Sequence, residues 1–218
     1  GTVLADDSGN VRSGSYLNVP TLGQLGALTG DTNTSVSFDG INDYAEVPYA
    51  AALNPAQFSL EAWAYLTGGQ GLFRSVISSR DTAVTKGFTL YAGDLNRWEL
   101  WLGDGGTGWT KLIGPAVVLN SWTHLVVTYG GTATMYVNGV QVASSALVYT
   151  PNTARPLRLA AGKPETAATY FFPGRLDEAA VYGTVLPAAR VQAHFSAASS
   201  SSPPPPATGL LKWAPPGW

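Results

Sequence analysis

Residues 35–48, SVSFDGINDYAEVP, contain two short β-type runs that flank a turn. The runs at 35–38 and 44–47 are separated by the five residues DGIND, and a connection of this length with a glycine inside it predicts a β-hairpin. Far downstream, residues 174–182, GRLDEAAVY, form another β-type run with two adjacent acids. The two stretches predict an all-β domain that carries acidic and amide oxygens at its turns and strands.

Clear alternation marks the strand expected at Phe58–Leu66, FSLEAWAYL. One set of its side chains is apolar and the other is polar or aromatic, which predicts one face against a core and one face turned away from it. The near-continuous apolar run Trp122–Tyr129 predicts a central buried strand. Asn138 and Gly139 separate two further β runs, and this pair favours a type I′ turn. Other strands are expected at residues 75–79, 87–92, 97–103, 109–113, 157–161 and 175–182.

Helical spacing occurs near the end of this series of strands. Pro187 suits a first helical turn, and Leu186, Arg190, Val191 and His194 fall on one side of a helix over residues 186–195. Many short strands without alternating helices predict an antiparallel sandwich or barrel rather than a doubly wound sheet.

The composition excludes several classes of protein. Hydrophobic residues make up 45% of the 218 residues, enough for a sizeable core, whereas charged residues reach only 12%. The formal net charge of −2 indicates neither a basic nucleic-acid surface nor a polybasic membrane patch. Because the chain has no cysteine, disulfides, thiolate nucleophiles and cysteine-based zinc sites are excluded.

A change of composition marks the end of the expected domain. Residues 199–206, SSSSPPPP, join a flexible serine half to an extended polyproline half, as is typical of an interdomain linker. We therefore expect a β-sandwich at residues 1–197, a Ser/Pro-rich linker at 198–206, and at 207–218 the start of a following module or a tail that packs back. Such a linker implies a parent protein with several domains, in which this domain is a monomer.

An ordered set of motifs runs through the chain: SVSFDGINDYAEVP, FSLEAWAYL, SVISSRD, GFTLYAG, LNSWTHLVVTYGGTATMYVNGVQVAS and FFPGRLDEAAVYGTVLPAARV. Together they resemble the laminin-G-like, concanavalin-A-like lectin/glucanase jelly-roll family, in its bacterial form. The resemblance covers residues 1–197 and implies two stacked antiparallel sheets. With the helix indicated by the spacing after Pro187, the expected fold is an all-β, two-sheet antiparallel β-sandwich (jelly roll) with one short C-terminal helix. It also implies a calcium ion and a non-catalytic role, as in many members of the family.

Oxygen-bearing side chains at the first turn are candidates for a cation site. Asp39, Asn42 and Asp43 crowd carboxylate and amide oxygens into one loop, and calcium binds about six to eight oxygens. Alternation places Asp177 and Glu178 on opposite faces of their strand, so only one of them can face a given site. The resemblance favours Asp39, Asn42, Asp43 and Asp177 as calcium ligands. The alternative is that the turn residues bond to their own backbone and that Asp177 or Glu178 pairs with an arginine.

Tryptophans in or beside the strands are candidates for a sugar platform. Trp98 and Trp101 lie on opposite faces of one expected strand, so one of them should point outward. Trp109 follows a glycine-rich turn, and Arg80 and Asn138 are polar residues that could line the same site. We expect Trp101, Trp109, Arg80 and Asn138 to bind a ligand. The alternative is that the indoles pack in the core.

The acids do not form the pattern of a glycoside hydrolase. Such an enzyme needs two facing carboxylates, about 5–9.5 Å apart. Glu61 and Glu99 are each alone on their expected strands, and no Gly-x-Ser-x-Gly elbow is present. We therefore expect no catalytic residues and no enzyme activity.

The expected function combines these observations with the resemblance. It is a non-catalytic, calcium-stabilised carbohydrate-binding module of a secreted or cell-surface multidomain protein, with a polysaccharide or glycan as partner. The alternative is a protein-interaction or structural spacer module of an adhesin-like extracellular protein. Solvent-facing Trp101 and Trp109 beside polar groups would favour the sugar.

Overall fold

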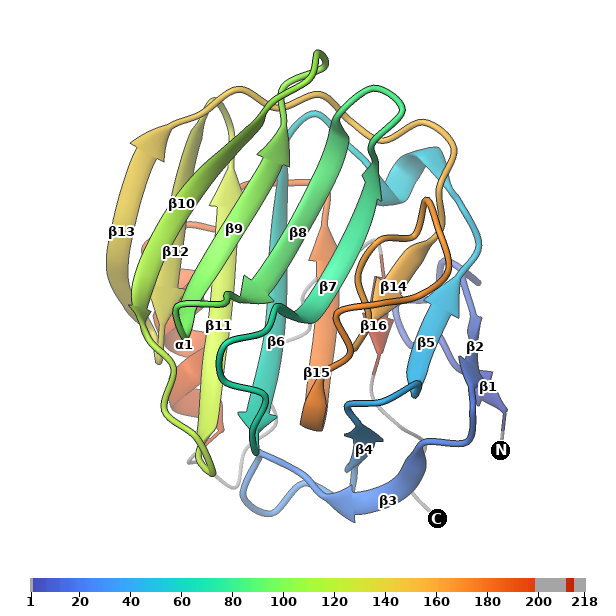
Figure 1. Ribbon diagram of the computed structural model, residues 1–218. Coiled ribbons are helices and arrows are strands. Elements are labelled where there is room, and N and C mark those ends of the chain that lie inside the picture. Colours follow the sequence, from blue (N-terminus) through green and yellow to red (C-terminus); the bar gives the residue numbers. More distant parts are fainter. Residues whose placement is uncertain (1, 199–210, 214–218) are drawn as a thin grey trace.

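The computed structural model describes residues 2–198 and 211–213, in which two antiparallel β-sheets pack face to face (Figure 1). Sheet A holds, in order across the sheet, β1 (Val3–Leu4), β2 (Gly14–Leu17), β5 (Tyr44–Val47), β14 (Leu157–Leu159), β7 (Arg74–Asp81), β8 (Lys86–Ala92), β9 (Arg97–Gly103) and β10 (Trp109–Ala116). Sheet B holds β13 (Val140–Ala146), β12 (Thr132–Val137), β11 (Trp122–Tyr129), β6 (Phe58–Leu66), β15 (Pro173–Tyr182), β4 (Thr34–Asp39) and β3 (Thr21–Leu25). The two-sheet antiparallel sandwich expected from the sequence is confirmed.

Two short elements lie outside the strand orders of the sheets given above. A short 3₁₀ helix, η1 (Ala51–Leu53), follows β5, and β16 (Leu211–Trp213) pairs with β15 opposite residues 179–181. The expected linker lies outside the described residues, apart from Ala198, and so does the rest of the segment 207–218. No helix in the described part of the chain is long and apolar enough to cross a membrane.

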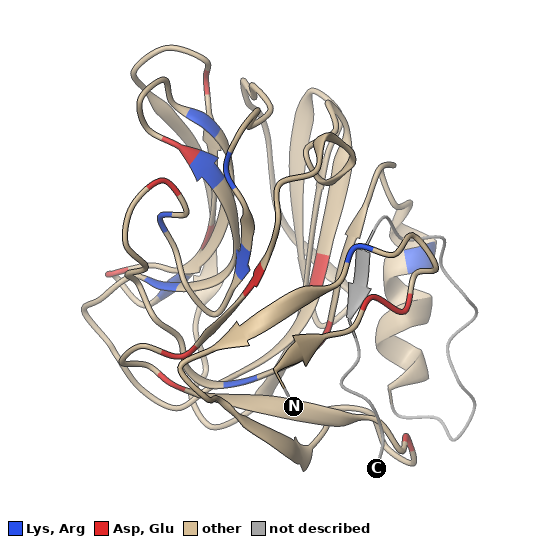
Figure 2. Cartoon of the chain, turned by 90° about the vertical axis from the view of Figure 1, so that its right-hand side faces the viewer, with Lys and Arg blue, Asp and Glu red and all other residues tan. Residues whose placement is uncertain are grey.

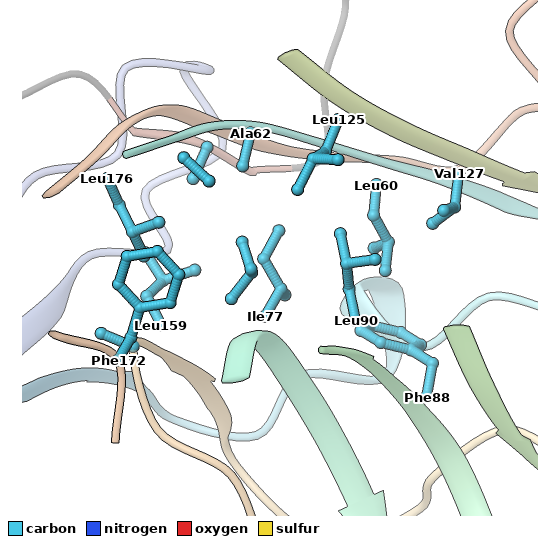
Figure 3. Packing of buried hydrophobic residues seen from close by; sticks show 14 of the residues in the cluster. Leu60, Ala62, Ile77, Phe88, Leu90, Leu125, Val127, Leu159, Phe172 and Leu176 are labelled. Carbon is cyan, nitrogen blue, oxygen red and sulfur yellow. The ribbon is translucent and has the colours of Figure 1, made fainter. Parts of the chain in front are cut away.

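The core lies between the sheets, where alternate side chains of both meet (Figure 3). Leu60 and Leu125 reach it from sheet B, and Ile77 and Leu90 reach it from sheet A; all four are fully buried. Burying a side chain of this kind stabilises a fold by about 1.5–3 kcal/mol. The apolar face predicted for the strand Phe58–Leu66 therefore forms part of this core.

The turn at residues 39–43 connects the two sheets and does not close the hairpin that the sequence predicted. β4 pairs with β15 and β3 in sheet B, whereas β5 pairs with β2 and β14 in sheet A. Val36 and Phe38 enter the core from one sheet, and Ala45 and Val47 enter it from the other. Alternation along the sequence predicts which side chains are buried, but it does not predict which sheet their strand joins. A short crossover between two sheets therefore gives the same sequence pattern as a hairpin within one sheet.

The hairpin predicted at Asn138-Gly139 is confirmed. β12 and β13 pair with Val137 opposite Val140, and the two turn residues between them have φ angles of 51° and 77°. A type I′ turn needs positive φ at both central positions, which asparagine and glycine adopt at little cost. The side chain of Asn138 also accepts a hydrogen bond from the backbone N–H of His124 at 2.9 Å, which ties the turn to β11.

The predicted helix is α1 (Ala188–Ala197), which lies on the outer face of sheet B, turned away from the core (Figures 1 and 2). Phe195 stacks on Trp63 of β6 with ring centroids 5.9 Å apart. The imidazole Nδ1 of His194 lies 3.0 Å from each carboxylate oxygen of Glu61, also on β6. The helix therefore covers Glu61 and Trp63 on the polar and aromatic face of β6.

Candidate functional site

The outer face of sheet A, turned away from the core, gathers aromatic and charged side chains. Neighbours on a strand point to opposite faces, so Leu100 and Leu102 of β9 enter the core while Trp101 between them points outward. The strand register places Thr89 of β8 and Lys111 of β10 directly opposite Trp101. A row of outward side chains therefore crosses three strands.

Trp101 is part of a cluster with Phe73, Tyr91 and Tyr170. Ring centroids lie 5.7 Å apart for Phe73 and Trp101, 5.9 Å for Tyr91 and Trp101, and 5.4 Å for Phe73 and Tyr170. These rings come from the β6–β7 connection, β8, β9 and the β14–β15 connection, so the tertiary fold assembles them. Tyr91 is buried, and the other three rings are half-exposed. The cluster therefore offers aromatic surface to a ligand on a rigid base.

Glu99 fixes the orientation of the Trp101 indole. The indole Nε1–H donates to the Glu99 carboxylate at 2.7 Å, and that carboxylate is only slightly exposed. Its other oxygen packs against Gly93, where an added Cβ would lie 2.2 Å from Glu99 Oε1. Glu99 is thus enclosed between the indole and the loop at Gly93, and its hydrogen bond fixes the position of the Trp101 ring.

Arg80 of β7 holds Trp109 and the nearby connection together. Its guanidinium lies 4.6 Å from the centroid of the Trp109 ring, donates to Tyr91 Oη at 2.9 Å and pairs with Glu165 at 2.8 Å. The residues opposite Arg80 and Trp109 on the intervening strands are Gly87 and Gly103. Because neither has a side chain, the guanidinium can cross two strands to reach the indole. Burial raises the pKa of Tyr91 to about 12, so its hydroxyl stays protonated at neutral pH.

The β14–β15 connection lies across part of this outer face (Figure 1). Two arginines anchor it: Arg80 through Glu165, and Arg158, which donates to the carbonyls of Gly162, Lys163 and Thr166. The carbonyl of Tyr170 also accepts the backbone N–H of Ser75 at 2.8 Å. The connection covers the β14 side of the sheet, and Trp101 and Trp109 stay half-exposed on β9 and β10.

Charges of both signs are interspersed over this part of the chain (Figure 2). Arg158 pairs with Glu46 at 2.8 Å, and Arg155 pairs with Asp81 at 2.9 Å. The face therefore has no broad field of one sign, and its charged groups act at short range.

A model of one protein family matches residues 39–192, more than half of the chain. That family is described as the concanavalin A-like lectin/glucanases superfamily. The chain belongs to this superfamily. The matched residues include most strands of both sheets and the aromatic cluster on sheet A. No curated protein sequence matches the chain.

Solved structures with a similar fold include domains of several bacterial proteins and a pentraxin. Domain 4 of AbnA, an extracellular arabinanase of Geobacillus stearothermophilus solved with arabinotriose, has a TM-score of 0.63 at 20% identity, over 90% of this chain and 93% of that one. The receptor-binding domain of botulinum neurotoxin type G has a TM-score of 0.62 at 12% identity, over 89% of this chain and 50% of that one. A pentraxin from Limulus polyphemus has a TM-score of 0.59 at 13% identity, over 79% and 87%. This chain thus spans about half the length of the toxin domain, and at these identities the likeness shows the fold.

The superfamily fold brings three of the four expected ligand residues to one face. Trp101, Trp109 and Arg80 lie on the outer face of sheet A, and Trp98 faces the core, as the alternation of β9 predicted. Asn138 lies on sheet B, in the turn before β13, so it belongs to a different part of the molecule.

Other residues of this face were not predicted. Tyr91, Glu99 and Lys111 alternate with core residues along their strands, so the strand pattern could have indicated them. Phe73 and Tyr170 lie on connections, where no periodic signal says which way a side chain points.

Asp39 and Asp43, two of the calcium ligands expected at the first turn, accept hydrogen bonds from the backbone of that turn. Asp39 Oδ1 accepts the N–H groups of Ile41, Asn42 and Asp43 at 2.8–3.2 Å, and Asp43 Oδ2 accepts the N–H of Asp39 at 3.3 Å. Burial acts to raise the pKa of Asp39, but the backbone donors outweigh it, so the pKa lies below its ordinary value. Burial and the Asp39 charge raise the pKa of Asp43.

Asp177 lies away from that turn. Asp39 is opposite Pro173 on β15, whereas Asp177 is opposite Trp63, four residues further along the strand or roughly 13 Å. Its carboxylate accepts the backbone N–H of Ala27 at 2.8 Å. In the described residues, no group of three or more His, Cys, Asp or Glu side chains is arranged to hold a metal. The four expected ligands do not form one donor set, and calcium stays a prediction for the turn alone.

Proposed function

We propose that this domain is a non-catalytic carbohydrate-binding module that holds its ligand on the outer face of sheet A. The observation that carries the proposal is the half-exposed Trp101 in its cluster with Phe73, Tyr91 and Tyr170. Aromatic rings offer a flat apolar surface with low conformational freedom, on which the C–H face of a sugar ring can stack. Nearby polar groups then fix the orientation of the ligand.

The neighbours support the same class of ligand. The arabinanase domain was solved with arabinotriose, and cell entry of botulinum neurotoxin type C is described as dependent upon interaction with two ganglioside molecules. That toxin structure has a TM-score of 0.68 at 12% identity, and it covers 89% of this chain and 48% of its own. The exposure of Trp101 and Trp109 beside polar groups favours a sugar over a structural spacer.

The carboxylates on this face support binding without catalysis. Glu99 accepts a hydrogen bond from Trp101, and Glu165 pairs with Arg80, so each holds a neighbouring side chain in place. A glycoside hydrolase would need two carboxylates that face one substrate. The module would instead raise the local concentration of a linked domain at its polymer, in a secreted or cell-surface protein.

Screening soluble polysaccharides and a glycan array tests the proposal, followed by titration of the best ligand. We expect Trp101→Ala and Trp109→Ala each to weaken binding by about tenfold or more, because stacking surface is lost. The matched control is Trp122→Ala, which removes a half-exposed indole from sheet B and should leave affinity unchanged. The proposal fails if no glycan binds the folded protein, or if both sheet A variants bind as well as wild type.

A further inference from the structure

Four aromatic rings on the outer face of sheet A each have a cation above them. The distances from cation to ring centroid are 4.6–5.1 Å, for Arg80 on Trp109, Lys111 on Trp101, Arg158 on Tyr44 and Lys163 on Tyr170. The two arginines also pair with carboxylates, Glu165 and Glu46. The two lysines differ from them: across residues 2–198, neither has a carboxylate oxygen within the 4.0 Å of an ion pair.

These lysines stand at the two ends of the aromatic cluster. Lys111 lies over Trp101, Trp101 contacts Phe73, Phe73 contacts Tyr170, and Lys163 lies over Tyr170. A chain of sugar rings laid along the cluster would therefore meet an ammonium group at each end. A lysine head group over a ring gains little at an exposed site, so it can move to a stronger partner without a large loss.

The acids of this face do not neutralise the lysines. Glu165 and Glu46 are held by arginines. Glu99 is buried, accepts the Trp101 indole N–H and packs against Gly93, so its carboxylate is held by the indole and has little contact with solvent. The charge that faces a ligand beside Trp101 is therefore the positive charge of Lys111.

We propose that this face binds an anionic oligosaccharide, whose carboxylate or sulfate groups pair with Lys111 and Lys163 while its rings stack on Trp101 and Tyr170. The inference rests on the proposed carbohydrate-binding function and specifies the class of sugar. The charge complementarity carries it, because the cation at each end of the stacking surface lies over a ring and has no carboxylate within ion-pair distance.

Calorimetric titration with three probes of similar length tests the inference. Tetragalacturonate carries carboxylates, its fully methyl-esterified form keeps the rings without the charge, and a sulfated tetrasaccharide carries sulfates. We expect one or both anionic probes to bind, the ester to bind much more weakly, and the affinity for the anionic probe to fall as sodium chloride is raised.

Charge-removing variants locate the contacts. Lys111→Met and Lys163→Met keep an unbranched side chain, and each should weaken binding of the anionic probe by roughly two- to fivefold. The matched control is Arg97→Met, at the start of β9, an exposed cation whose guanidinium has no ring or carboxylate partner in the described structure. It should leave affinity unchanged, and Trp101→Ala should weaken binding of the same probe.

The outcomes separate this inference from the proposed function. If the methyl ester or a neutral glycan binds as tightly as the acid, or if both lysine variants bind normally, the anionic inference is wrong and the carbohydrate platform stands. If no probe and no polysaccharide binds, both are wrong.

Discussion

The two outer faces of this sandwich use the same short motif in opposite ways. On β6 of sheet B the motif is Glu61-Ala62-Trp63, and on β9 of sheet A it is Glu99-Leu100-Trp101. In both strands the alanine or leucine enters the core, and the glutamate and tryptophan point outward. On sheet A, Glu99 orients its own tryptophan, which stays half-exposed. On sheet B, helix α1 covers both side chains.

Under the helix, Glu61 becomes the centre of a buried polar network. Its Oε1 lies 2.7 Å from His124 Nε2, its Oε2 accepts the Tyr182 hydroxyl at 2.7 Å, and His194 of α1 lies 3.0 Å from both oxygens. The rings of Trp63, His124 and Phe195 contact one another, with centroids 4.9–6.0 Å apart. The motif thus anchors a helix on one sheet, and on the other it forms part of the proposed ligand platform. The difference is that helix α1 packs on the sheet B motif and not on the sheet A motif.

The largest expected effect comes from removing the anchor. Glu61→Ala leaves two buried imidazoles and a hydroxyl without their shared acceptor, so we expect the free energy of unfolding to fall by about 3–5 kcal/mol. The matched change on the other sheet, Glu99→Ala, removes one hydrogen bond and should cost about 1 kcal/mol while weakening glycan binding. Urea unfolding of both variants measures the difference. Equal losses would show that the two motifs have the same role.

Lowering the pH should weaken the same polar network around Glu61. Burial acts to raise the pKa of Glu61, but hydrogen bonds from His124 and His194 outweigh it and lower the pKa from 4.5 to about 2. A depressed pKa contributes stability above the unfolded value of about 4.5 that is lost as the pH falls toward 2, about 3 kcal/mol in all. Unfolding free energies from pH 5.5 to 2.5 should fall more steeply for wild type than for Glu61→Gln. Parallel pH profiles would contradict this assignment.

The smallest expected effect concerns the turn at residues 39–43, which joins the two sheets. If calcium binds Asp39, Asn42 and Asp43, a chelator should lower the melting temperature of wild type by about 2–4 °C, because a ligand of the folded state contributes about 1 kcal/mol. Asp39→Ala should melt at one temperature with and without chelator. Superimposed wild-type melts would show that the carboxylates serve only the turn.

Much of the fold followed from the sequence. The alternation of Phe58–Leu66 predicted its core face, the pair Asn138-Gly139 predicted the β12–β13 turn, and helical spacing after Pro187 predicted α1. These signals are local, because strand and helix periods and turn φ angles depend on residues close in sequence. The hairpin predicted at residues 39–43 was wrong because the sheet that a strand joins depends on partners distant in sequence, which local patterns do not reveal.

The candidate site likewise combines features that the sequence predicts with features that only the tertiary structure shows. The sequence alone determined that Trp98 and Trp101 point to opposite faces, and it singled out Trp109 and Arg80. Only the tertiary structure brought Phe73 and Tyr170 to Trp101, separated Asp177 from Asp39, and placed α1 over one Glu-x-Trp motif and not the other. A period of two residues fixes the side of the strand from which a side chain projects, because that depends on local backbone geometry. What covers that side depends on how distant segments pack, which no local pattern contains.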